Sequence, residues 1–363
     1  MDLEIKEKIN KKPSLFPTTR YQGSKRRLAP WLFSILSEVE FETVLDGFGG
    51  SASASYLFKL MKKEVHFNDV LQSSYQTGLA LIENSDITLE ENDYKYLLDM
   101  DEDASCPTFI EDNFENIYYY PDENRWLDQI AFRIRTWSIE ATQEAIKYKQ
   151  ALAYHALFQA CLSKRPFNLF HRKNLYLRDG DVERSFGNKK TWDTDFAVLF
   201  RKFGDEASSK IISNKKSNRA SCGDLMQLDN IGYDLIYLDP PYQRPSETKP
   251  KDYFDLYHFM EGLIDYDNWG ERIDVSRKHK PLKKISSDLD SKSPLERIRL
   301  IIERFQDSKI AISYGAPGIP TVDELKELLK EYKNTVNVYE TEYSYKLNKK
   351  NGSSYREVLL VGE

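Results

Sequence analysis

The chain has 363 residues and a formal net charge of −6, with 52 lysines and arginines against 58 acidic residues. This length allows one large or two unequal domains, and the acidic total excludes a uniformly basic nucleic-acid-binding protein, so any DNA contact must be local. The cysteines Cys106, Cys161 and Cys222 lie far apart, which indicates neither a disulfide framework nor a metal site. Without an apolar signal core or about 20 consecutive apolar residues, we expect a cytoplasmic protein with no membrane partner.

The N-terminal part combines a polar lead-in, residues 1–18, with a basic loop, residues 20–27. Apolar residues then recur at helical spacing over 28–35, so the loop is predicted to lead into an amphipathic helix. Cations at a helix N-terminus oppose the helix dipole, which suggests that Lys25 or Arg26 has another partner. The alternative is a solvated basic turn.

A glycine-rich segment follows the first predicted strand, residues 43–46. Its sequence over 47–52 is GFGGSA, and a helix is predicted directly after it. Glycines between a strand and a helix let a ligand approach the backbone, but the spacing fits neither a dinucleotide fingerprint nor a P-loop. A second predicted strand, 64–68, ends at Asp69, which is placed either to bind ribose hydroxyls or to cap the helix predicted over 70–81.

Residues 86–215 interrupt this alternation and are predicted to form an inserted helical and target-recognition region. The segment 126–162 has a helical pattern, and the segments 163–174 and 185–192 interleave cations with aromatic residues. Cations can hold phosphates, while aromatic, Asn and Arg side chains can wedge between bases or read them. The predicted DNA contacts are Lys164, Arg165, Asn168, Arg172, Lys173, Asn188, Lys189 and Lys190. Solvated loops are the alternative.

The strand and helix pattern returns over 216–363, which together with 19–85 is predicted to form the catalytic domain. A strand over 218–222 leads to Asp224, and a buried strand over 234–238 ends at Asp239-Pro240-Pro241-Tyr242. Each proline fixes φ and lacks an N–H, so the strand ends in a rigid turn that holds an acid near an aromatic ring. That pair suits a flat heterocycle with an amino group.

The remaining elements are a long insertion and a closing hairpin. The insertion, residues 244–294, is predicted to be a lid or target clamp, or else a packed helical excursion. After it, helices are predicted over 294–305 and 321–332, on either side of a buried strand over 309–314. A hairpin formed by 335–345 and 355–361, with Asn351-Gly352 at its turn, ends the chain.

Four strands whose carboxyl ends carry a glycine loop or an acid would converge on one crevice of a doubly wound α/β sheet. In this order the motifs resemble those of the DNA adenine methyltransferases of the DNA adenine methylase type, over residues 19–85 and 165–363. The resemblance implies a mixed seven-stranded sheet of the S-adenosylmethionine-dependent methyltransferase fold. Two positions depart from the family pattern: Tyr21 stands where tryptophan is common, and Ala52 replaces the last glycine of the loop.

The resemblance also implies the site residues and the cofactor, S-adenosylmethionine. The cofactor-binding residues are Tyr21, Lys25, Asp46, Phe48, Gly50, Asp69, Asp224 and Asp239. The catalytic residues are Asp239, Pro240, Pro241 and Tyr242.

The chemistry of adenine methylation fits these residues. The exocyclic amine is a poor nucleophile, and accepting its N–H bonds with Asp239 and the Pro240 carbonyl would make its lone pair available to the sulfonium methyl group. Positioning and electrostatics would dominate, without a covalent intermediate. The base must leave the duplex, and stacking on Tyr242 would offset part of that cost.

We therefore expect a site-specific adenine-N6 methyltransferase of double-stranded DNA, with no metal, in a restriction-modification or related host or phage system with a possible companion endonuclease. Alternatives are methylation of RNA adenine or of a protein glutamine, and a catalytically silent DNA-binding subunit. The intact motif from Asp239 to Tyr242 argues against a silent subunit.

Overall fold

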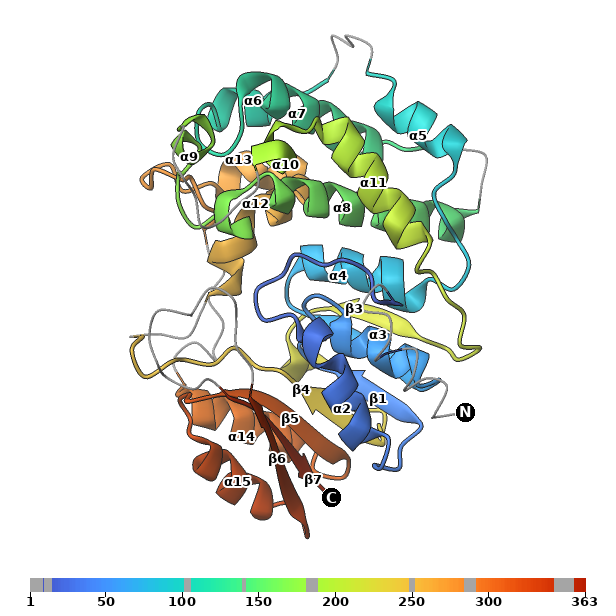
Figure 1. Cartoon of the computed structure of the whole chain (residues 1–363), viewed down its shortest axis with the longest axis vertical. Coiled ribbons are helices and arrows are strands. Elements are labelled where there is room, and N and C mark those ends of the chain that lie inside the picture. Colours follow the sequence, from blue (N-terminus) through green and yellow to red (C-terminus); the bar gives the residue numbers. More distant parts are fainter. Residues whose placement is uncertain are drawn as a thin grey trace.

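A seven-stranded sheet forms the base of the structure, and a helical lobe lies above it (Figure 1). The computed structural model describes residues 9, 15–100, 106–138, 142–180, 189–247, 252–283, 292–342 and 356–363. The predicted hairpin turn at Asn351-Gly352 lies outside these residues.

The strand order is β3-β2-β1-β4-β5-β7-β6, and β7 is antiparallel to both of its neighbours. The strands are β1 (Thr43–Asp46), β2 (Glu64–Asp69), β3 (Arg219–Cys222), β4 (Leu235–Leu238), β5 (Lys309–Ala316), β6 (Val336–Glu342) and β7 (Arg356–Gly362). The first five are parallel. This confirms the predicted mixed sheet. Because the strand order reverses between β1 and β4, the loops after these two strands diverge and open a crevice.

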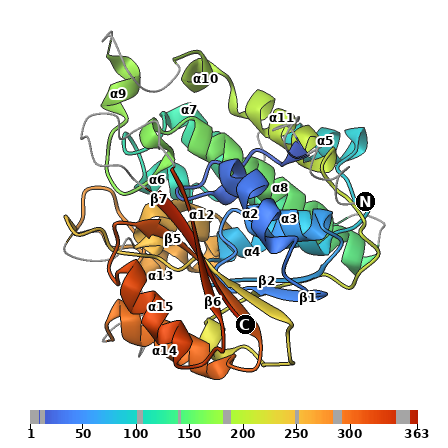
Figure 2. The same ribbon diagram turned by 60° about the horizontal axis from the view of Figure 1, so that its bottom comes forward.

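Alternating side chains of the buried strands form two separate cores. In β4, Leu235 and Tyr237 join the core shared with the lobe, whereas Ile236 and Leu238 join the core on the opposite face. This follows from the two-residue period of a strand. Figure 2 shows α14 (Pro294–Arg304) and α15 (Val322–Lys330) on one side of the strands and α2 (Ala29–Leu36) and α3 (Ser53–Leu60) on the other.

The helix predicted over 70–81 consists of two parts in the structure. It begins as α4 (Gln72–Gly78) and continues as a π-helical turn, Leu79–Glu83. The buried amine of Lys59 donates hydrogen bonds to the carbonyls of Leu81 and Asn84 and so satisfies the end of this turn.

The lobe is built around one long buried helix. This helix, α8 (Gln143–Ser163), is buried on all sides from Ala151 to Ser163 and packs against α4 and against α11 (Phe196–Ser208). The helical pattern predicted over 126–162 therefore covers two helices, most of α7 (Pro121–Arg135) and α8. The other helices of the lobe are α5 (Glu91–Leu98), α6 (Phe109–Asn113), α7 (Pro121–Arg135), α9 (Tyr176–Asp179), α10 (Lys189–Asp193) and α11 (Phe196–Ser208).

The described part of the 244–294 insertion is a packed helical excursion, the second of the two predicted alternatives. It forms α12 (Tyr253–Ile264) and α13 (Trp269–Arg272), and both helices join the lobe (Figure 1). The ring of Trp269 is fully buried against Phe109 and Phe114. Residues 248–251 and 284–291 lie outside the described part.

Among the described helices, none has the length and apolarity required to cross a bilayer.

Candidate active site

One large cavity, of about 2580 Å³, lies where β1, β2 and β4 end. Every residue predicted to bind cofactor or to act in catalysis lines this cavity, including both prolines. The sheet therefore brings together motifs that are more than 200 residues apart in the chain.

The glycine loop is held to the sheet by its own backbone. The N–H of Gly47 donates to the Tyr237 carbonyl at 3.0 Å, and that of Gly49 donates to the Asn68 carbonyl at 2.9 Å. A Cβ atom on Gly49 would lie 2.1 Å from the Phe67 ring, so only glycine fits there. Gly50 and Ala52 both have positive φ, of 49° and 58°. Ala52 thus occupies a backbone conformation that favours glycine, which explains the usual residue at this position.

Two buried acids flank the loop. Ser55 donates to Asp46 Oδ2 at 2.6 Å, whereas Asp46 Oδ1 is buried and has no hydrogen-bond partner among the described residues. Asp69 accepts the N–H groups of Gly50 and Leu71, each at 2.8 Å. Burial raises the pKa of Asp46 to about 7 and that of Asp69 to about 6. Both acids therefore favour a ligand that brings positive charge or hydroxyl donors.

Asp239 is paired with the lysine of the N-terminal loop. The Lys25 amine lies 3.0 Å from Asp239 Oδ1 and 3.4 Å from Glu357 Oε2, and it is 4% exposed. This confirms that Lys25 has a partner other than solvent. Burial raises the pKa of Asp239 to about 6, against the opposing effect of Lys25. Glu357 was not expected from the sequence; its only signal was a lone acid at the start of an apolar strand.

Tyr242 lies at the end of the rigid turn. Its ring is half-buried and lies 5.1 Å from the Tyr314 ring, centroid to centroid, at a tilted angle. Pro240 is buried under the turn and Pro241 is exposed. The ring of Tyr242 is thereby held at the cavity wall rather than free to rotate into solvent.

Residues of α12 complete the site, and none of them was among the predicted site residues. Tyr21 stacks on Tyr257 at 4.7 Å and on Tyr253 at 5.6 Å between ring centroids. The buried carboxylate of Glu261 accepts the N–H groups of Gln72 and Ser73 at the start of α4, at 2.9 and 2.8 Å. An acid inside the otherwise apolar stretch of α12 was the available signal. The insertion thus fixes both the aromatic wall and the helix after Asp69.

Asp224 lies at the edge of the same cavity. Its side chain accepts the N–H of Met226 at 2.9 Å and so orders the turn after β3. The neighbouring side chains of Leu225 and Met226 line the cavity and offer it an apolar surface.

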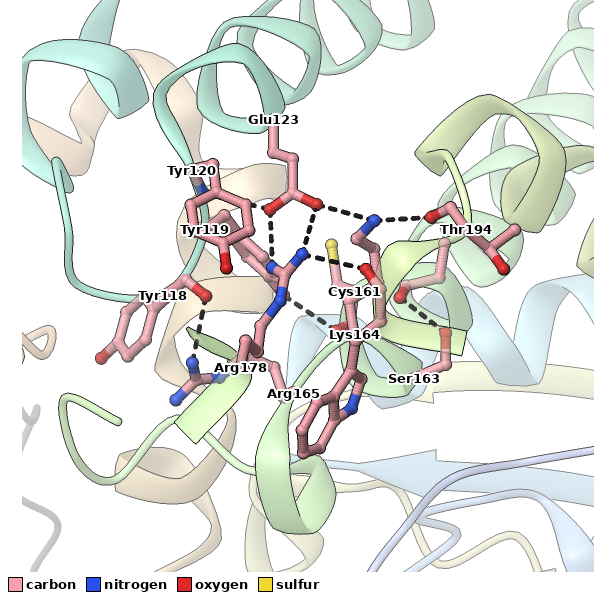
Figure 3. Close-up of polar contacts among 12 residues, drawn as sticks. Tyr118, Tyr119, Tyr120, Glu123, Cys161, Ser163, Lys164, Arg165, Arg178 and Thr194 are labelled. Carbon is pink, nitrogen blue, oxygen red and sulfur yellow. Dashed lines mark hydrogen bonds and ion pairs between the residues drawn. The ribbon is translucent and has the colours of Figure 1, made fainter. Parts of the chain in front are cut away.

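Two of the predicted DNA contacts are internal, which corrects the prediction for them. Lys164 and Arg165 are 2% and 1% exposed. Figure 3 shows the Glu123 carboxylate between the Lys164 amine and the Arg178 guanidinium. Lys164 also donates to the Thr194 carbonyl at 2.6 Å. The Lys164 cation closes the end of α8 onto α7 and the segment before α11, a role that charge patterning cannot distinguish from DNA contact.

Replacement of Glu123 by glutamine is expected to lower the free energy of unfolding by about 3 kcal/mol, because it leaves two buried cations without a counterion. Burial alone would raise the pKa of Glu123, but Arg178 and Lys164 outweigh it and the pKa is lowered, so the carboxylate is charged at neutral pH. Urea denaturation measures the loss. The control is Glu111→Gln, which removes a less buried acid from the same lobe; equal stability of the two variants would contradict the prediction.

Arg165 instead shapes a turn that reaches the cavity. Its guanidinium donates to the carbonyls of Leu169 and Arg172, at 3.2 and 3.1 Å, and to the side chain of Asn174. The turn places Phe167 and Asn168 at positive φ, 66° and 57°. Such strain in residues other than glycine clusters at functional sites.

The other predicted DNA contacts are divided between two places. Asn168 and Arg172 line the cavity. Lys173, Lys189 and Lys190 are exposed on the lobe outside the cavity lining. Asn188 lies outside the described residues.

Comparison with known proteins agrees with this geometry. A family model described as D12 class N6 adenine-specific DNA methyltransferase matches residues 21–293. The type II methyltransferase M2.HphI of Haemophilus parahaemolyticus is 28% identical over 356 residues, which cover 96% of this chain and 98% of that protein. The modification methylase StsI of Streptococcus sanguinis is 25% identical, and the match covers 93% of this chain but 50% of StsI. The type II methyltransferase M.NlaIII of Neisseria lactamica is 21% identical over 89% of this chain and 91% of its own.

The family model covers well over half of the chain, and the family it describes acts on DNA rather than RNA or protein. The chain therefore belongs to the D12 class of N6 adenine-specific DNA methyltransferases.

Proposed function

We propose that this enzyme takes its methyl group from S-adenosylmethionine and modifies a flipped adenine at a specific site in double-stranded DNA, as part of a restriction-modification system. The observation that carries the proposal is the convergence of the glycine loop, Asp69 and the Asp239-to-Tyr242 turn on one cavity. The type II methyltransferases among its relatives support the restriction-modification setting.

The cavity fits this cofactor on three counts. Asp46 Oδ1 offers a buried acceptor without a partner among the described residues, which suits an ammonium donor. Asp69, at the end of the second strand, is placed for ribose hydroxyls. Tyr21 adds a fixed aromatic face, and Leu225 adds an apolar one, for a flat base. When bound, the cofactor supplies a methyl group on a positively charged sulfur.

The residues of the chain prepare the amine for that methyl group. Lys25 holds one oxygen of Asp239, which fixes the carboxylate at the end of β4. Asp239 and the carbonyl of Pro240 accept the N–H bonds of the target amine, and Tyr242 stacks on the extruded ring. Charge that develops on the amine nitrogen is stabilised by the carboxylate, so catalysis comes from positioning and electrostatics.

The Phe167 turn and nearby cations are proposed to receive the duplex. Arg172 and Lys292 are exposed, and both line the cavity together with Arg244 and Arg297. Phe167 is 40% exposed and lines the same cavity. An aromatic side chain on a fixed, strained turn is suited to fill the space left in the base stack by an extruded adenine.

Phe167→Ala is expected to lower kcat/KM for DNA by about tenfold, because the stacking of one base on an aromatic side chain contributes roughly 1–3 kcal/mol. Affinity for S-adenosylmethionine should not change. Steady-state kinetics on an oligonucleotide duplex measure the effect. Tyr176→Ala is the matched control, since Tyr176 is an exposed aromatic residue of the same lobe outside the cavity lining. Equal kinetics of the two variants would contradict the proposal that Phe167 fills the space left by the extruded adenine.

Long-read modification mapping of DNA from a host that expresses the chain tests the proposed function directly. We expect N6-methyladenine at one short sequence, and none in a host expressing Asp239→Ala. Unmodified DNA from the wild-type host, with purified protein that is folded, would refute the proposal.

A further inference from the structure

Glu357 is a fully buried acid whose position the methyltransferase motifs do not explain. It is the second residue of β7, has 0% exposure, and is followed by the apolar run Val358 to Val361. In register it lies between Gly315 of β5 and Thr341 of β6. The sheet itself needs no acid there, and a buried carboxylate is costly unless it is paired.

Glu357 forms an ion pair with the lysine that also pairs with Asp239. The Lys25 amine lies 3.4 Å from Glu357 Oε2 and 3.0 Å from Asp239 Oδ1. One buried cation is therefore shared by two carboxylates, one at the end of β4 and one on β7. One acid is enough to neutralise a lysine, so the effect of the second on Asp239 is what the site gains from this arrangement.

Because Asp239 shares the Lys25 amine with Glu357, its carboxylate remains a stronger hydrogen-bond acceptor. A lysine fully engaged by Asp239 would withdraw charge from that carboxylate and weaken its bond to an amine. Glu357 attracts the same ammonium from the opposite strand and opposes this withdrawal, as its upward effect on the pKa of Asp239 indicates. Asp46 and the hydroxyl groups of Tyr237 and Tyr253 also act electrostatically with Asp239.

We propose that Glu357 is a positioning residue for methyl transfer, which acts through Lys25. It holds the ammonium group between the two acids, so that Asp239 is fixed at Oδ1 yet keeps enough negative charge to accept the N–H of the target amine with its other oxygen. This role rests on the proposed adenine methylation, because it concerns the group that polarises the amine.

Glu357→Gln tests the role, since it keeps the shape of the side chain and removes its charge. We expect kcat to fall about 10-fold to 100-fold, as for a misplaced catalytic group, while KM for DNA and the Kd for S-adenosylmethionine stay within about twofold. The acid limb of the kcat profile should move to lower pH, because one negative charge near Asp239 is gone. Glu340→Gln, which removes an exposed acid of the neighbouring strand β6, is the control and should leave all four quantities unchanged.

A double-mutant cycle with Lys25→Met separates a role through Lys25 from a structural one. In the Lys25→Met background, loss of Glu357 should reduce kcat no further. Equal reductions in both backgrounds, or loss of cofactor affinity in parallel with kcat, would overturn the proposal. If Glu357→Gln does not fold, Lys25→Met/Glu357→Leu is compared with Lys25→Met alone: equal kcat supports the proposal and a further loss overturns it.

The same assays separate this role from the proposed function. A folded wild type that transfers no methyl group to DNA overturns both. An active wild type whose kcat survives Glu357→Gln overturns the role of Glu357 alone.

Discussion

Asp239→Ala is expected to lower kcat for methyl transfer to DNA by about 10²-fold to 10³-fold, the effect of removing one electrostatic contact to the reacting group. The physical reason is that the amine then loses the acceptor that frees its lone pair. Binding of S-adenosylmethionine should weaken less than kcat falls, because its other proposed contacts, on the N-terminal loop and at the ends of β1, β2 and β3, remain. Transfer of a labelled methyl group to duplex DNA measures kcat, and calorimetry measures cofactor binding.

The pH dependence of kcat in the wild type is a second test of the role of Asp239. Asp239 has a pKa raised to about 6, so it accepts hydrogen bonds above that pH and is increasingly protonated below it. We expect kcat to fall as the pH drops through about 6. Asp229→Ala, which removes an exposed acid from the loop before β4, is the control. Full activity of folded Asp239→Ala would refute the assignment of this acid.

Asp46→Asn is expected to make the free protein more stable at pH 8 while abolishing most of its affinity for S-adenosylmethionine. The pKa of Asp46 is raised to about 7 from 3.8, so the ionised acid costs on the order of 4 kcal/mol in the folded state. Asparagine removes this cost and still accepts the hydrogen bond from Ser55. A cationic ligand, however, then loses its buried counterion, and we expect its Kd to rise about 100-fold.

The pH dependence has a defined sign. With a folded pKa above the unfolded one, wild-type stability falls as the pH rises from about 4 to 7, and the advantage of Asp46→Asn is complete above that window. Asp234→Asn is the contrasting control: backbone N–H groups of Glu42 and Thr43 lower the pKa of Asp234, so this change should destabilise the protein at neutral pH. Thermal melts from pH 5 to 8, with and without S-adenosylmethionine, measure both. An Asp46→Asn variant that binds the cofactor normally would contradict the prediction.

The sheet and the acids and glycine loop of the site could be predicted because these motifs lie at the ends of strands. Strand β1 has the predicted bounds, and Asp69, Asp224 and Asp239 lie at or just after the carboxyl ends of three other strands, which parallel packing brings to one edge. At these strand ends, the structure expected from the local sequence is the one that the folded sheet has. That agreement is why weak motifs, taken together, identified the family.

The predictions failed where the role of a charged side chain depends on how deeply it is buried. Lys164 and Arg165 have the same composition signal as exposed DNA contacts, yet Glu123 and backbone carbonyls hold them inside the lobe. Glu261 and Glu357 are the reverse case, since acids within apolar stretches suggested no site until packing placed them beside α4 and Lys25. Sequence spacing gives the period of an element, but not which of its charges will find a partner.

The ion pair between Lys25 and Glu357 joins residues 332 positions apart. Because β7 lies between β5 and β6, Glu357 meets Lys25 only when this strand has paired with the sheet. Contacts of such high sequence separation form late and pay the largest loop-closure entropy. The glycine loop and the Asp239 turn follow β1 and β4, whereas the second acid of Lys25 comes from β7. Under the proposed role of Glu357, full catalytic competence thus depends on the pairing of β7 with its two neighbours, and not on the motif residues alone.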